Sequence, residues 1–78
     1  LLLMKENFEC KIIRKLAVLS DCQKGWQLEL NEVSWNGDPP KLDLRRWNAD
    51  HTKCNKGITL TRKEAENLLA ALKEELEE

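Results

Sequence analysis

The chain changes its pattern once, at residue 60, and this change limits the folds that it can adopt. Before residue 60, apolar and polar residues alternate and β-branched or aromatic residues recur, as they do in strands. Beyond it, apolar residues recur at helical spacing, at Ala65, Leu68, Leu69, Leu72 and Leu76. Several strands followed by one helix predict an α+β domain in which the helix covers one face of an antiparallel sheet. The other face is then free for a ligand.

The first sixty residues contain four segments with strand patterns, at Phe8–Leu19, Trp26–Trp35, Lys41–Trp47 and Gly57–Leu60. In the first of them, the doubled apolar pair Ile12 and Ile13 breaks the alternation and indicates a bulge. In the second, the apolar positions shift from one parity to the other midway. We therefore expect a second bulge near Asn31 or Glu32, and the face that Trp35 occupies depends on it.

Two short motifs mark the ends of these elements. The sequence Asn-Gly-Asp-Pro at residues 36–39 predicts a tight turn, because asparagine and glycine tolerate a positive φ. Thr61 and Glu64 have the spacing of a capping box, in which each side chain accepts a hydrogen bond from a free amide of the first helical turn. The helix is therefore expected to start at Thr61.

The third strand separates two kinds of side chain most clearly. Its two leucines, Leu42 and Leu44, point to one side of the sheet. The opposite side carries charged and aromatic residues, namely Lys41, Asp43, Arg45 and Trp47. We expect the leucine side to form the core and the charged, aromatic side to remain open.

The size and charge of the chain limit the number of domains that it can form and the classes of molecule that it can bind. With 78 residues it forms one domain, which we place at residues 8–78 after a flexible stretch at 1–7. So small a domain is marginally stable alone, and dimerisation is a common remedy. The net charge of −1 argues against nucleic acid, but the charge is unevenly distributed. Residues 41–60 hold five basic and two acidic side chains, a net +3, whereas residues 61–78 hold three basic and six acidic ones, a net −3.

No motif of an enzyme or a metal site is legible. His51 and Cys54 have a spacing that could provide half of a zinc site, but Cys10 and Cys22 do not form a second close pair. We therefore expect a polar loop with a solvated histidine and thiol, no cofactor, no metal and no catalytic residue. Three cysteines without framework spacing indicate reduced thiols inside a cell. The apolar opening at residues 1–4 is too short for a signal or a membrane span, which favours a cytoplasmic protein.

Binding of single-stranded nucleic acid suits the remaining features. Proteins hold single strands with basic side chains that follow the backbone and with aromatic rings on which bases stack. Trp47 shares its strand face with Lys41 and Arg45, which is the required combination. Trp35 and Trp26, at the two ends of the second strand, are further candidates for stacking.

The stretch Pro40–Trp47, followed by Lys56-Gly57-Ile58-Thr59-Leu60-Thr61, resembles the core of the positive cofactor four family. The tryptophan-rich second strand, with the turn at residues 24–26, is most similar to the bacterial branch of that family. The resemblance implies a curved four-stranded sheet with a C-terminal helix, a homodimer formed through helices and last strands, and binding of single-stranded DNA. It implies DNA contacts at the matching positions Trp35, Arg45, Trp47 and Lys56.

Position and charge extend this set of expected contacts to Lys24, Trp26, Lys41 and Lys53. The expected function is that of a sequence-tolerant single-stranded-DNA-binding homodimer, a transcriptional coactivator or an accessory of replication or repair, associated with the nucleoid and with the transcription or replication machinery. Glu29 and Glu32 depart from the basic character that would help binding. A single-stranded RNA binder of the same fold and a protein-interaction module remain the alternatives.

Overall fold

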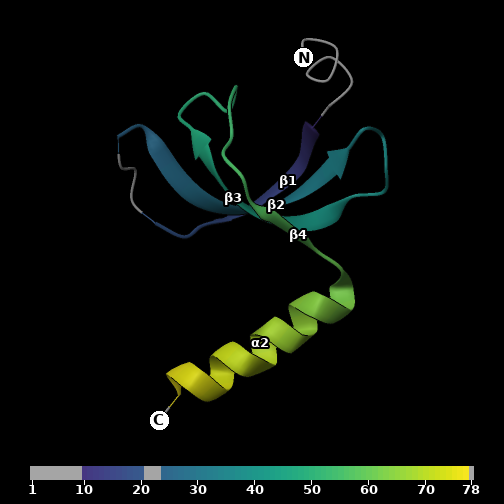
Figure 1. Ribbon diagram of the computed structural model, residues 1–78, viewed down its shortest axis with the longest axis vertical. Coiled ribbons are helices and arrows are strands. Elements are labelled where there is room, and N and C mark those ends of the chain that lie inside the picture. The colour runs from purple at the N-terminus through teal and green to yellow at the C-terminus, as the bar shows by residue number, and fades with distance from the viewer. Residues whose placement is uncertain (1–9, 21–23, 78) are drawn as a thin grey trace.

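The computed structural model describes residues 10–20 and 24–77, so the expectations for residues 1–9 and for Cys22 lie outside the described residues. Four strands form one antiparallel sheet in the order of the chain, and one helix follows (Figure 1). The elements are β1 (Cys10–Val18), β2 (Trp26–Trp35), β3 (Lys41–Asn48), β4 (Ile58–Leu60) and α2 (Arg62–Leu76). The expected order of four strands and a helix is confirmed.

The bulges lie in β1 alone and not in β2. The pairing of β1 with β2 shifts between Ile12 and Arg14 and again between Lys15 and Ala17, which confirms the irregularity expected at the doubled isoleucines. The pairing of β2 with β3 is continuous from Trp26 to Val33. The prediction of a bulge in β2 near Asn31 or Glu32 was therefore wrong. The extra residues that interrupt the pairing lie in the neighbouring strand β1 instead.

The predicted tight turn at residues 36–39 and the predicted capping box are both confirmed. Asn36 and Gly37 have φ values of 52° and 81°, and the Asp38 amide donates to the Trp35 carbonyl at 2.8 Å to close the turn. At the start of α2, the Thr61 hydroxyl accepts from the Glu64 amide, and the Glu64 carboxylate accepts from the Thr61 amide.

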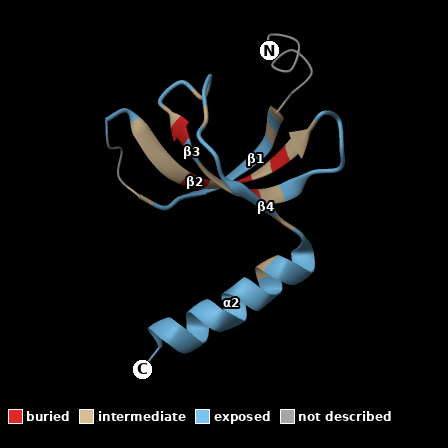
Figure 2. Ribbon diagram, in the orientation of Figure 1, coloured by how far each residue is buried: buried red, intermediate tan, exposed pale blue. Residues whose placement is uncertain are grey.

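The sheet is bent, and the charged face of β3 is the one that becomes buried. Asp43 and Trp47 are 0% and 4% exposed, whereas Leu42 and Leu44 on the other face are half-buried. The buried segments lie within the sheet, and none lies in the helix that follows it (Figure 2). The expectation of a leucine core under an open charged face was therefore wrong. The physical reason is curvature: side chains on the inner side of a bent sheet converge and cover one another, and the bulges of β1 increase that bend.

The helix does not cover the sheet, contrary to the expectation that it would occupy one face. It leads away from β4 on the outer side of the bend (Figure 1). No residue of α2 is buried, and Ala65 alone among its residues is half-buried. Its apolar stripe is exposed, with Leu69, Leu72 and Leu76 at 61%, 46% and 73%. In the part of the chain that the structure describes, no helix is both long and apolar enough to cross a bilayer.

Gly57 is required where the chain enters β4. A Cβ atom at this position would overlap the Leu44 carbonyl oxygen and the Cβ of Arg45, both on the neighbouring strand β3. We therefore expect Gly57→Ala to lower the free energy of unfolding by about 1–3 kcal/mol, the cost of overpacking a close contact. Urea denaturation followed by circular dichroism measures this loss. Gly37→Ala is the comparison for steric room, because a Cβ there meets no atom and only its positive φ opposes the change. Equal unfolding curves for wild type and Gly57→Ala would contradict the close approach.

Candidate nucleic-acid interface

The inner face of the sheet brings together three of the predicted residues. Because β2 and β3 pair without a bulge, Trp35 lies on the same face as Arg45 and Trp47. Trp26 has the opposite parity in β2 and lies on the outer face, half-buried, where it pairs with Asn48. The sequence thus indicated the shared face of Arg45 and Trp47 and left that of Trp35 open; the continuous pairing adds Trp35 to this face and separates Trp26 from it.

Arg45 is held by an acid and lies over a tryptophan. Its Nε donates to Asp43 Oδ1 at 2.7 Å and an Nη donates to Asp43 Oδ2 at 2.9 Å. Its Cζ is 4.6 Å from the centroid of the Trp35 ring, a cation–π distance. Burial disfavours the charged guanidinium, but the hydrogen bonds and charge of Asp43 outweigh this and raise the pKa of Arg45. The ion pair of Arg45 with Asp43 is buried, because the two side chains are 11% and 0% exposed.

Trp47 is the predicted stacking residue whose accessibility differs most from the expectation. It is 4% exposed, and its ring centroid lies 5.6 Å from that of His51. Its Nε1 is buried and has no hydrogen-bond acceptor among the described residues. A buried donor without an acceptor costs about 1–3 kcal/mol.

The predicted lysines are exposed on turns and strand ends. Lys53 lies on the loop after β3, where its amide donates to Asn48 Oδ1 at 2.9 Å. Lys56 follows Asn55, whose carbonyl accepts from an Nη of Arg45 at 3.3 Å, so the chain at Lys56 is close to Arg45. Lys24 lies in the turn before β2 with φ of 54°, and Lys41 lines a hollow between the sheet and α2 on the outer side. The structure therefore brings Lys56 near the tryptophan face and leaves Lys24 apart from it. Lys41 has the parity of Asp43 and Arg45 but lies at the start of β3, beside the outer hollow.

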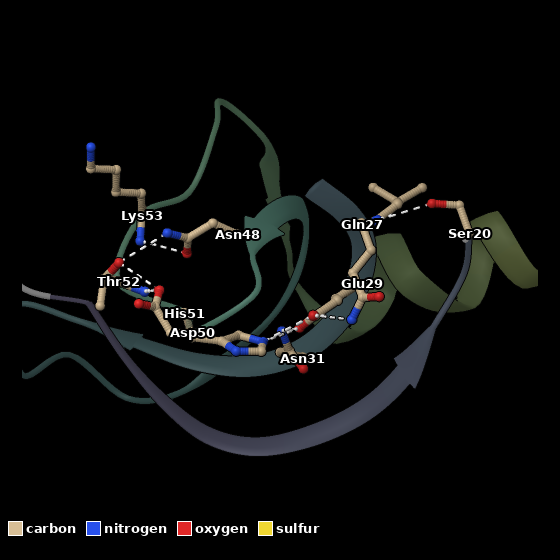
Figure 3. Close-up of polar contacts among 10 residues, drawn as sticks. Ser20, Gln27, Glu29, Asn31, Asn48, Asp50, His51, Thr52 and Lys53 are labelled. Carbon is tan, nitrogen blue, oxygen red and sulfur yellow. Dashed lines mark hydrogen bonds and ion pairs between the residues drawn. The ribbon is translucent and has the colours of Figure 1, made fainter. Parts of the chain in front are cut away.

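A second buried polar cluster on the inner face was missed at the sequence level. Glu29 is 2% exposed, and its two carboxylate oxygens accept from Asn31 Nδ2 at 3.0 Å and from Gln27 Nε2 at 2.9 Å (Figure 3). His51 Nε2 lies 3.0 and 2.9 Å from the same two oxygens. Burial alone would raise the pKa of Glu29, but the hydrogen bonds from Asn31, Gln27 and His51, with the charge of His51, lower it.

His51 is therefore not the solvated loop residue that the sequence suggested. It has a left-handed φ of 60°, and its amide donates to the Asn48 carbonyl at 3.1 Å. Alternation of polar residues at 27, 29 and 31 could have indicated one polar strand face, but nothing in the spacing of residues 29 and 51 indicates their contact. Glu32, the other acid noted in this strand, lies on the outer face and pairs with Arg14 at 3.1 Å.

The two cysteines in the described chain are free and half-buried. Burial, with the nearby groups Cys54 and Asp43, raises the pKa of the Cys10 thiol to about 11. At neutral pH this thiol is protonated and weakly reactive. Among the described residues, no three side chains of histidine, cysteine, aspartate or glutamate gather as metal ligands.

Comparison with known proteins is consistent with this arrangement. Residues 22–71 match the sequence model of a family described as Transcriptional Coactivator p15 (PC4). A protein of Treponema pallidum (strain Nichols), described as uncharacterized, is 44% identical over 61 residues, which cover 78% of this chain and 72% of that protein. The matched residues include β2, β3 and β4 and most of α2.

Proposed function

Because the chain belongs to the transcriptional coactivator p15 (PC4) family, a family of nucleic-acid-binding proteins without enzymatic activity, we propose that it binds single-stranded DNA on the inner face of its sheet. The observation that carries the proposal is the stack of Arg45 on Trp35, at 4.6 Å, beside the exposed Lys56. Trp35 is half-buried and offers an aromatic surface, and Arg45 keeps N–H groups beyond those that bind Asp43. Stacking of bases on Trp35 and contacts of phosphates with Lys53 and Lys56 follow.

In this proposal Trp47 does not stack against bases, as the sequence had suggested that it would, but has a structural role. Buried beside His51, it supports the inner face and is not itself a stacking surface. Arg45 likewise acts mainly by orienting Trp35, since its strongest hydrogen bonds go to Asp43. Lys24 and Trp26 are peripheral to this surface, and Lys41 lies at its edge, at the start of β3.

The protein acts as a homodimer in our proposal. The apolar residues buried in the described chain are only Val33 and Trp47, which is a small core. At the same time Ile58 and the leucines of α2 are exposed, and monomeric soluble proteins rarely expose large contiguous apolar patches. A second copy that packs on α2 and β4 would bury them. Two inner faces would then be available for one strand of DNA, in the service of transcription, replication or repair.

Titration of a labelled thymine oligomer tests the proposal. At low salt we expect a rise in fluorescence anisotropy on binding, and affinity should fall steeply with added salt because released counterions oppose binding. Trp35→Ala should weaken binding about 5- to 150-fold, the equivalent of about 1–3 kcal/mol per stacked base. Trp26→Ala on the outer face is the matched control and should bind like wild type.

Two outcomes would count against the proposal. Absence of binding to the thymine oligomer at low salt would refute it, provided that thermal melting shows a folded protein. Equal losses in Trp35→Ala and Trp26→Ala would move the interface away from the inner face. Competition with the matched uracil RNA oligomer separates the RNA alternative, since only contacts with the 2′-hydroxyl distinguish the two ligands.

A further inference from the structure

A hollow of about 300 Å³ lies on the inner face between β1 and the Glu29 cluster. One wall is aliphatic and consists of Leu16, Ala17 and Val18 of β1, and the floor and far side are polar, with Glu29, Asn31 and His51. This volume is at the lower end of those that hold small organic ligands. An apolar wall beside a polar floor suits an aromatic heterocycle, whose face packs on aliphatic groups while its edge forms hydrogen bonds.

The floor of the hollow is rich in hydrogen-bond acceptors. Glu29 is an ionised carboxylate, and the amide nitrogens of Asn31 and Gln27 both point toward it (Figure 3). Because each amide nitrogen faces Glu29, the carbonyl oxygen of the same amide faces away from it and is also an acceptor. A ligand edge that carries adjacent N–H donors is complementary to such a floor.

His51 occupies the position at the two carboxylate oxygens of Glu29 where a ligand would bind. Its single Nε2 lies at nearly equal distances, 3.0 and 2.9 Å, from both oxygens of Glu29. One N–H shared between two acceptors binds each of them less well than two separate N–H donors would. The His51 side chain is 22% exposed and belongs to the loop after β3, so it approaches the carboxylate from the solvent side.

We propose that this hollow selects guanine from a bound single strand, with guanine N1–H and the 2-amino group donating to the two oxygens of Glu29 in place of the His51 ring. This inference rests on the proposed function and adds a base preference to it. Guanine alone among the common bases has two adjacent donors on its pairing edge. Thymine has one N–H between two carbonyls that the carboxylate repels, and cytosine and adenine have only the amino group beside a ring acceptor. Lys15, which also lines the hollow, would neutralise the negative charge of the phosphate of the selected nucleotide.

The experiment compares thymine oligomers that carry one central guanine, inosine, cytosine or adenine, by competition against the labelled thymine oligomer. Wild type should bind the guanine oligomer about five- to tenfold more tightly than the thymine oligomer, toward the low end of a bidentate base contact because the His51 contact is lost. Inosine lacks the 2-amino group and should lose most of this preference. Glu29→Gln should abolish the preference and keep thymine binding within about twofold, whereas His51→Ala should increase the ratio of guanine to thymine affinity.

Glu32→Gln is the matched control, because Glu32 lies in the same strand on the outer face and should leave the preference unchanged. Equal binding of all the oligomers by wild type, or a preference for cytosine, would overturn the inference while thymine binding kept the proposed function intact. Failure to bind any oligomer would overturn the proposed function itself. Should Glu29→Gln melt before it can be assayed, the comparison of guanine with inosine on wild type still decides, since equal affinity for the two overturns the inference.

Discussion

Arg45→Met should lower the free energy of unfolding by about 3–5 kcal/mol, the largest loss that we expect from a single substitution in this chain. Removal of the guanidinium leaves the Asp43 carboxylate, which is 0% exposed, without its charged partner at 2.7 Å. A protein this small has few kcal/mol to lose, so a substantial unfolded fraction is expected. Urea denaturation at fixed protein concentration, followed by circular dichroism, measures the change.

Arg46→Met is the matched control, because Arg46 is the next residue of β3 and is exposed on the other face. Its unfolding curve should lie close to that of wild type. The double variant Asp43→Leu with Arg45→Met should recover part of the loss, since no buried charge then remains unpaired. If Arg45→Met and Arg46→Met unfold alike, the Asp43 pair does not stabilise the fold.

Leu72→Glu should convert the proposed dimer into monomers and destabilise it. Leu72 lies in the middle of the apolar stripe of α2 and is 46% exposed in the single chain. Burial of a charge in an interface between two copies is unfavourable, and the lost apolar contact alone is of the size of about 2–5 kcal/mol per leucine. Sedimentation equilibrium over a range of concentrations measures the change in mass.

Asn67→Glu provides the control for the added charge. Asn67 lies on the opposite side of the same helix from the stripe and is exposed. It should leave the dimer mass and the thermal melting temperature unchanged. A monomeric wild-type protein, or a dimer that tolerates Leu72→Glu as well as Asn67→Glu, would contradict an interface on the apolar stripe.

The elements of this protein follow from local chemistry and could be read in the sequence. The turn at Asn36 and Gly37 and the capping box of Thr61 with Glu64 each depend on a few neighbouring residues, and both formed where expected. Strand alternation also placed Arg45 and Trp47 on one face, because side chains in a strand point to alternate sides whatever the sheet does next.

Only the tertiary structure decided which face is buried and what completes the site. Alternation separates two faces but does not say which of them is the inner side of the bend, and the inner side covered Trp47 and Asp43. The contact of His51 with Glu29 joins residues 22 positions apart through the pairing of β2 with β3 and the loop that follows. The stripe of α2 looked like a cover for the sheet, since periodicity shows that a helix has an apolar face and not which surface that face will meet.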